Sequence, residues 1–173
     1  MPIRPLHLLL PLLICAGLAR ATELETAQKL WQAGQKPQAL AAVERALTQT
    51  PDDLKLRFAL GVMKMELGEQ ATALTIFIAL SQDFPDLVEP FNNLAVIHAA
   101  QGELDQARSE LEQALRLQPE HAQAQENLGD VMVRLAARAY QRAQAALPAP
   151  SDVLAMKLRR TQALLPPSPQ TLP

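Results

Sequence analysis

The sequence predicts an all-α chain built from helical repeats, and three observations lead to this fold class. The 173 residues include 29 Ala and 31 Leu, which are good helix formers, while aromatic residues make up only 3%. This composition argues against an aromatic-rich β-sandwich. Glycine recurs every 34 residues, at Gly34, Gly68 and Gly102. Proline keeps the same period of 34 residues, at Pro51, Pro85 and Pro119.

The charge balance narrows the classes of partner. Charged residues make up 20% of the chain and the formal net charge is −2. No overall positive field draws such a chain to nucleic acid or to anionic lipid, so we expect no nucleic-acid partner. The length fits a single domain.

The first element, residues 1–21, has the layout of a secretory signal peptide. Arg4 precedes an apolar run over residues 8–18, and Ala19-Arg20-Ala21 supplies a small-x-small cleavage site. The run is too short to span a membrane. We therefore expect cleavage after Ala21 and a periplasmic protein without a membrane span, with an uncleaved amphipathic anchor as the alternative. Lipid attachment at Cys15 is not expected, because Ile14 stands where lipoprotein signals require a small side chain.

The repeats follow over residues 22–148. The 34-residue period divides them into units at about 22–53, 54–87 and 88–121, with an atypical fourth unit at 122–148. Aligned on the glycines and prolines, Ala39, Ala73 and Ala107 share one position, as do Leu60, Leu94 and Leu128. Each unit reads as a helix hairpin.

These marks resemble the tetratricopeptide repeat (TPR). In the best copy they are Leu60-Gly61, Gly68, Ala73, Phe77, Leu80 and Pro85. The resemblance implies a TPR-type α-solenoid of about three helix hairpins, followed by a long fused helix and a C-terminal capping helix.

The glycines are assigned two structural roles. Gly34, Gly68 and Gly102 lie where one helix must end and the chain reverse, which favours a left-handed residue. Gly61 and Gly129 lie inside first helices, where glycine is unfavourable unless a neighbouring helix approaches closely. The prolines end the second helices.

The last elements depart from the period. The fourth unit lacks the five residues that would contain its turn glycine, so we predict one long helix over about 121–147. Ser151 then offers an N-cap for a capping helix over 151–165, with an apolar stripe formed by Val153, Leu154, Leu158, Leu164 and Leu165. Residues 166–173 contain four prolines and are expected to form a disordered tail.

No pattern indicates catalysis, a metal or a cofactor. The five glycines that follow the expected signal peptide are all assigned to repeat positions, so none remains for a phosphate-binding loop. His98 and His121 are 23 residues apart with no neighbouring cysteine, which argues against a metal site. His98 is expected to be a half-buried packing residue. We expect a non-enzymatic protein without a cofactor.

In tetratricopeptide solenoids the first helices line a concave groove, and the resemblance implies which residues would line it here. The candidate partner-binding residues are Leu24, Gln28, Trp31, Phe58, Val62, Met65, Asn92, Val96, Asn127 and Asp130. Other groove positions hold Gln32, Lys55, Glu66, Glu89, Ala99, Ala100, Gln123, Glu126 and Arg134. Some family members clamp a peptide carboxylate with lysine and arginine at two particular positions of each repeat. Those positions carry no lysine or arginine in this chain.

Our hypothesis is that the apolar end of this groove receives hydrophobic anchors of a partner peptide or helix. Asn92 and Asn127 would bond the partner's backbone. The alternative is that Trp31 and Phe58 pack between helices, and that Asn93 and Asn127 occupy a structural asparagine position.

A narrower resemblance covers residues 89–165. Segments such as Glu-Pro-Phe-Asn-Asn-Leu-Ala at 89–95 and Glu-Asn-Leu-Gly-Asp at 126–130 are similar to small exported proteobacterial tetratricopeptide proteins. The sequence therefore predicts a periplasmic adaptor that binds a protein partner. The alternative is an accessory factor of peptidoglycan or exopolysaccharide assembly that contacts envelope enzymes or the polymer.

Overall fold

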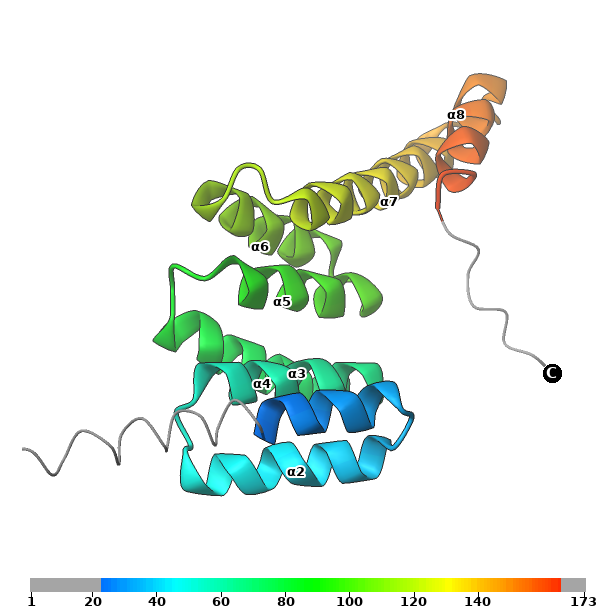
Figure 1. Cartoon of the computed structure of the whole chain (residues 1–173). Coiled ribbons are helices and arrows are strands. Elements are labelled where there is room, and N and C mark those ends of the chain that lie inside the picture. Colours follow the sequence, from blue (N-terminus) through cyan, green and yellow to red (C-terminus); the bar gives the residue numbers. More distant parts are fainter. Residues whose placement is uncertain (1–22, 166–173) are drawn as a thin grey trace, which may run out of the picture. The chain divides into compact units, whose positions relative to one another are not determined.

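The computed structural model describes residues 23–165, and every regular element in this part of the chain is an α-helix (Figure 1). The expected signal peptide and the expected tail lie outside the described residues. A first helix covers residues 23–32. The others are α2 (Lys36–Gln49), α3 (Leu54–Glu66), α4 (Gln70–Asp83), α5 (Val88–Ala100), α6 (Leu104–Leu117), α7 (Ala122–Ala146) and α8 (Asp152–Gln162). The predicted all-α fold class is confirmed.

The chain forms two compact units, and the boundary between them in the sequence falls within α4. Unit 1 extends to Leu80 and unit 2 begins at Ser81. The core of unit 1 contains small side chains from the first helix and α2 together with Leu56 and Met63 of α3. The core of unit 2 is built by α5, α6 and α7 around the fully buried Leu111. Each core therefore forms between successive helices of the chain, as expected for hairpin repeats.

The repeated alanine position is fully buried in each of the three repeats that carry it. Ala39, Ala73 and Ala107 have no exposed surface. Because alanine carries only a methyl group, the second helix of each repeat can approach its neighbours closely at this position. The sequence period thus corresponds to a repeated packing position.

The turn glycines have the left-handed conformation that the sequence predicts. The φ angles of Gly34, Gly68 and Gly102 are 76°, 79° and 81°. In the first turn Gln35 N–H donates to the carbonyl of Leu30 at 2.9 Å, and Gly34 N–H donates to that of Trp31 at 3.0 Å. This pair of bonds is the Schellman motif, and the other two turns repeat it.

The helix boundaries around the prolines also follow from local chemistry. Pro51, Pro85 and Pro119 each lie two residues after a second helix ends. Asp53 caps the next first helix, since its carboxylate accepts from Leu56 N–H at 3.0 Å. His121 caps α7 in the same way through Nδ1, which accepts from Ala124 N–H at 3.1 Å.

Gly61 and Gly129 occupy the same repeat position but have different surroundings. A Cβ on Gly61 would lie 2.9 Å from two ring carbons of Phe77, so α3 and α4 meet there without room for a methyl group. Gly129 has nothing within 4 Å of its Cβ position. The expectation of a close helix contact at Gly129 is wrong. The missing turn glycine removes the second helix that would have covered this face of α7.

The fourth unit is the predicted continuous helix. α7 runs for 25 residues and extends past the end of α6 to α8 (Figure 1). Arg138 of α7 pairs with Asp105 of α6, and this hydrogen bond lowers the pKa of the Asp105 carboxyl below its ordinary value. The ion pair therefore joins α6 and α7 beyond the shared core.

α8 packs against α7. Ser151 is its N-cap, as predicted, with Oγ accepting from Leu154 N–H at 3.4 Å. The predicted apolar stripe is partly wrong. Leu154, Leu158 and Leu165 are half-buried, whereas Val153 and Leu164 are 58% and 69% exposed. Only residues facing α7 find a packing partner on this short helix.

The two glycines generate a matched prediction. Gly61→Ala is expected to lower the free energy of unfolding by about 1–3 kcal/mol, because the Phe77 ring is fully buried and must shift. Gly129→Ala is expected to raise it by about 0.5–1 kcal/mol, because alanine favours the helix and meets open space. Urea unfolding followed by circular dichroism measures both. Equal destabilisation by the two substitutions would contradict the packing described.

Candidate functional site

The ten candidate partner-binding residues divide between the two units. Unit 1 holds Leu24, Gln28, Trp31, Phe58, Val62 and Met65, and unit 2 holds Asn92, Val96, Asn127 and Asp130. Within unit 1 only Gln28 is exposed and the other five are half-buried.

Trp31 is held in place inside unit 1. Its indole Nε1 donates to Oε2 of Glu66 at 2.9 Å. The Lys36 ammonium lies 5.1 Å from the centre of its ring, within the range of a cation–π interaction. The polar edge and one face of this side chain therefore already have partners from α3 and α2.

Phe58 also has a packing partner in unit 1. Its ring meets that of Phe77 edge to face, with centroids 5.7 Å apart and an angle of 63° between the planes. Both aromatic candidates therefore pack between helices, as the alternative interpretation requires. Partner binding by Trp31 and Phe58 stays a prediction.

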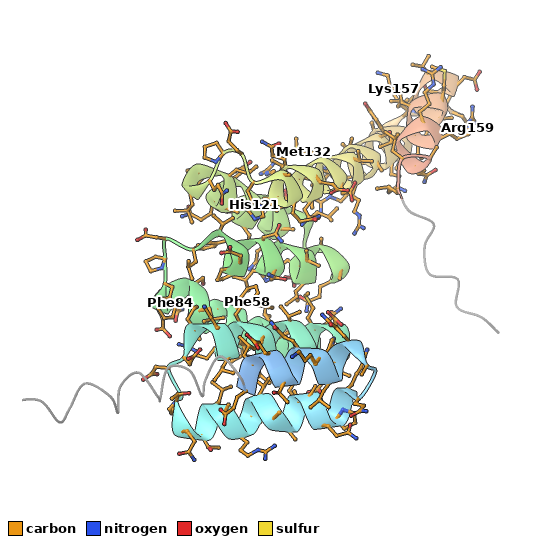
Figure 2. All side chains as sticks on the ribbon, viewed as in Figure 1. Phe58, Phe84, His121, Met132, Lys157 and Arg159 are labelled. Carbon is orange, nitrogen blue, oxygen red and sulfur yellow. The ribbon has the colours of Figure 1, made fainter. Side chains whose placement is uncertain are left out.

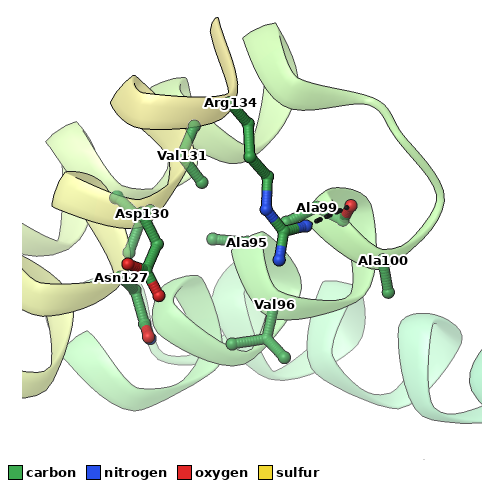
Figure 3. A pocket seen from close by; sticks show the side chains of 9 residues that line it. Ala95, Val96, Ala99, Ala100, Asn127, Asp130, Val131 and Arg134 are labelled. Atoms are coloured by element: carbon green, nitrogen blue, oxygen red, sulfur yellow. Dashed lines mark hydrogen bonds between the residues drawn. The ribbon is translucent and has the colours of Figure 1, made fainter. Parts of the chain in front are cut away.

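Unit 2 contains a cavity of about 210 Å³ that is lined mainly by residues of α5 and α7 (Figure 3). Leu111 of α6 contributes to it, and the side chains from α5 are small. Three of the four candidates in this unit, Val96, Asn127 and Asp130, line the cavity. The full lining is Ala95, Val96, Ala99, Ala100, Leu111, Asn127, Asp130, Val131 and Arg134.

The fourth candidate, Asn92, is linked to the cavity through Asn127. Asn127 Nδ2 donates to Asn92 Oδ1 at 2.9 Å, and Asn127 Oδ1 accepts from Gln123 Nε2 at 3.2 Å. The amide nitrogen of Asn92 has no hydrogen-bond acceptor among the described residues. Asn93 differs, because its side chain donates to the carbonyl of Glu89 in its own helix at 2.8 Å. Asn93 is structural, while Asn92 retains donors for a ligand.

Charged groups border the cavity on α7. Asp130 and Arg134 are one helical turn apart, so they share a face of this helix. The guanidinium of Arg134 donates to the carbonyl of Ala99 at 3.3 Å, in the last turn of α5 (Figure 3). A cation is favourable at this end of the helix dipole. The cavity therefore combines an apolar floor with one carboxylate and one guanidinium.

Sequence reasoning missed Ala95, Leu111 and Val131 as lining residues. All three are buried and belong to the core of unit 2. The only signal in the sequence was the small residue that recurs one position after the periodic leucine, as in Leu94-Ala95. That signal predicted helix contact rather than a cavity.

His98 is more buried than the sequence suggested. It is 4% exposed, its Nδ1 has no hydrogen-bond partner, and its Nε2 lies 3.9 Å from Glu103 Oε2. Burial raises the pKa of the nearby Glu110 carboxyl, and the His98 charge opposes that rise. Over residues 23–165, no group of three or more His, Cys, Asp or Glu residues could hold a metal ion.

Two family models match the sequence. The model described as tetratricopeptide repeat matches residues 24–86, and the model described as TPR repeat matches residues 97–135. No curated protein matches the chain. None of the helices in the described part is long and apolar enough to cross a membrane.

Solved structures show a similar fold. The first TPR of Spaghetti (RPAP3), bound to the HSP90 peptide SRMEEVD, has a TM-score of 0.62 and 17% identity over 68% of this chain and 93% of that one. The Yersinia enterocolitica type III secretion chaperone SycD, in complex with a peptide of the translocator YopD, gives 0.60 and 16% over 66% and 93%. The thermophilic TPR protein TTC0263 of Thermus thermophilus gives 0.61 and 22% over 83% and 81%.

The environment of Glu110 generates a prediction of pH dependence. Because its pKa is raised in the folded chain, its carboxylate lowers the free energy of unfolding at neutral pH, and this cost disappears as the pH falls through the raised value. Glu110→Gln should therefore be more stable than the wild type at pH 7.5. The difference should shrink towards zero below the ordinary pKa of 4.5.

Urea unfolding at several pH values measures this difference. Glu112→Gln is the matched control, because Glu112 is exposed and pairs with Arg108 at 3.7 Å. The control should change the free energy of unfolding by less than about 0.5 kcal/mol. A Glu110→Gln protein that is less stable than the wild type at pH 7.5 would contradict the burial argument.

Proposed function

The chain belongs to the tetratricopeptide repeat family, and from that premise we propose that it is a non-enzymatic adaptor that binds a segment of a partner protein. The cavity of unit 2 is the observation that carries this proposal. It lies on the first helices α5 and α7, the face that the family uses for binding according to the resemblance.

The size of the cavity fits part of a peptide. At about 210 Å³ it is smaller than the roughly 300–1,000 Å³ of sites that enclose a whole small molecule. The apolar floor of Ala95, Val96 and Ala99 suits one aliphatic side chain. The free amide hydrogens of Asn92 are placed to donate to a peptide carbonyl, and Asp130 favours a basic residue in the partner.

Solved relatives support a peptide as the ligand. The Spaghetti structure holds the HSP90 peptide SRMEEVD and the SycD structure holds a YopD peptide. The positions at which some family members clamp a carboxylate are occupied here by Asn92, Val96, Glu126 and Asp130 in unit 2. An acidic C-terminal peptide would meet carboxylates there, so we propose a neutral or basic internal segment as the partner.

We also propose that the adaptor acts in the periplasm. Support comes from Arg4, the apolar run over residues 8–18 and the Ala19-Arg20-Ala21 cleavage site. Fractionation of expressing cells and N-terminal sequencing of the recovered protein test this. A cytoplasmic protein that retains Met1 would overturn it.

A role in peptidoglycan or exopolysaccharide assembly is the alternative. Direct contact with a sugar polymer needs exposed aromatic faces, and Trp31 is engaged by Glu66 and Lys36. We therefore favour contact with a protein of the envelope. Pelleting of the protein with purified sacculi, compared with that of Trp31→Ala, distinguishes contact with the polymer from contact with a protein.

The peptide proposal is tested by selecting binders to the full chain from a displayed peptide library and measuring their affinities by calorimetry. Ala99→Leu fills the cavity and Asn92→Ala removes the free donor. Each is expected to weaken binding about tenfold or more, because the first excludes the anchor and the second leaves a carbonyl unpaired. Met132→Ser is the control, since Met132 is 50% exposed and does not line the cavity.

A second set of variants tests the contribution of unit 1. The Trp31→Ala, Phe58→Ala double variant should lose affinity if these rings receive hydrophobic anchors. Unchanged affinity in a folded double variant would assign both rings to packing alone. If no peptide is selected, or if Ala99→Leu and Met132→Ser bind equally well, the cavity is not the site and the proposal fails.

A further inference from the structure

Charge is segregated along unit 2 in a way that the net charge of the chain conceals. Residues 81–129 contain nine carboxylates and only two cations, Arg108 and Arg116. From residue 130 to 165 there are two carboxylates, Asp130 and Asp152, and six cations. The cations are Arg134, Arg138, Arg142, Lys157, Arg159 and Arg160. The end of unit 2 formed by α7 and α8 is therefore basic.

The cations of this end are not equally available. Arg138 pairs with Asp105, and Arg134 donates to the carbonyl of Ala99. Lys157 lies 5.7 Å from the centre of the Tyr140 ring, which leaves its charge uncompensated. Arg159 and Arg160 are exposed and have no ion-pair partner within residues 23–165. The free positive charge is concentrated on α8, where Figure 2 labels Lys157 and Arg159.

The outer face of α8 and the turn that follows it add exposed apolar surface to these charges. Val153 and Met156 of α8 are 58% and 39% exposed, and Leu164, two residues after the helix ends at Gln162, is 69% exposed. Lys157 and Arg160 follow Val153 by four and seven residues, a spacing that places them on the same side of the helix. The continuous apolar stripe of α8, with Leu154 and Leu158, is already packed on α7.

Local hydrogen bonds tie the start of α8 to the end of α7. Ser151 caps its first turn, and the Gln144 side chain of α7 bridges the backbone of the same residue. With the amide oriented to satisfy both groups, Gln144 donates to the Ser151 carbonyl at 3.2 Å and accepts from the Ser151 N–H at 3.0 Å. The outer face is thereby oriented away from α7.

We infer that the outer face of α8 binds an anionic phospholipid surface. Alkyl side chains interleaved with long cationic ones suit a membrane interface, because the alkyl groups enter the acyl boundary while lysine and arginine extend to the headgroups. A protein groove would instead require a continuous apolar stripe, and that stripe is covered by α7. The acidic residues 81–129 would be repelled from the same surface, which leaves the cavity accessible to a partner.

The local charge of α8 differs in sign from the net charge of the chain. A chain of net charge −2 has no overall attraction to anionic lipid. Electrostatic attraction to a membrane acts over about one Debye length, so the local charge of α8 decides it rather than the sum over the chain. The site lies outside the cavity and does not depend on the proposed peptide binding.

Co-sedimentation of the full chain with lipid vesicles tests the inference. One set of vesicles contains equal parts phosphatidylglycerol and phosphatidylcholine, and the other contains phosphatidylcholine alone. The apolar run at the N-terminus is common to every variant, and the neutral vesicles report its contribution. We expect stronger partitioning to the anionic vesicles, decreasing as salt is raised from about 50 to about 500 mM.

Three variants locate the binding surface. Arg159→Gln with Arg160→Gln should reduce the anionic partitioning about 25-fold, at roughly fivefold per cation. Val153→Ser with Leu164→Ser should reduce it about tenfold. Arg45→Gln with Arg116→Gln removes the same charge from exposed sites on α2 and α6, and should change partitioning less than about twofold. Circular dichroism confirms that each variant is folded.

Three outcomes would overturn the inference. Equal partitioning of the wild type to neutral and anionic vesicles would exclude recognition of the anionic surface. Equal losses in the α8 and control arginine variants would show non-specific attraction. The third outcome is that the wild type shows no vesicle preference but binds immobilised polyglutamate, and that Arg159→Gln with Arg160→Gln abolishes this binding. The face would then bind an acidic protein instead.

Discussion

The rest of the structure depends on close packing of helices at two repeated positions that carry small residues. Ala39, Ala73 and Ala107 are fully buried, and Gly61 meets the Phe77 ring with no space for a methyl group. Such an approach needs the chain to reverse sharply after each first helix. The Schellman turns at Gly34, Gly68 and Gly102 provide that reversal, because their left-handed backbone is strained for any residue with a Cβ.

The same constraint determines which side chains remain for function. The face of α5 and α7 that carries the cavity includes the small packing residue Ala95 in its lining, together with the polar border. The Asn92–Asn127 bond joins the two helices and leaves the amide hydrogens of Asn92 free. Packing in a repeat thus produces a cavity with a polar border from ordinary side chains.

The fourth unit departs from the 34-residue period, and this departure changes which surfaces are exposed. Without a turn glycine, α7 continues for 25 residues. Within residues 23–165 no second helix returns onto its first half, and Gly129 and Met132 are exposed. α8 covers a different part of α7 and presents its own outer face. The basic end of unit 2 lies on this continuous helix and on α8.

The sequence by itself determined the fold class, the turn positions and the continuous α7, because these depend on local properties. Glycine at a left-handed position, proline after a helix and an unbroken helical pattern act within a few residues. The tertiary structure decided what depends on neighbours distant in the chain. Phe77 fills the space at Gly61 while nothing fills it at Gly129, and Trp31 is bonded to Glu66, 35 residues away. The cavity itself depends on how α5, α6 and α7 pack, which the identity of its small lining residues does not specify.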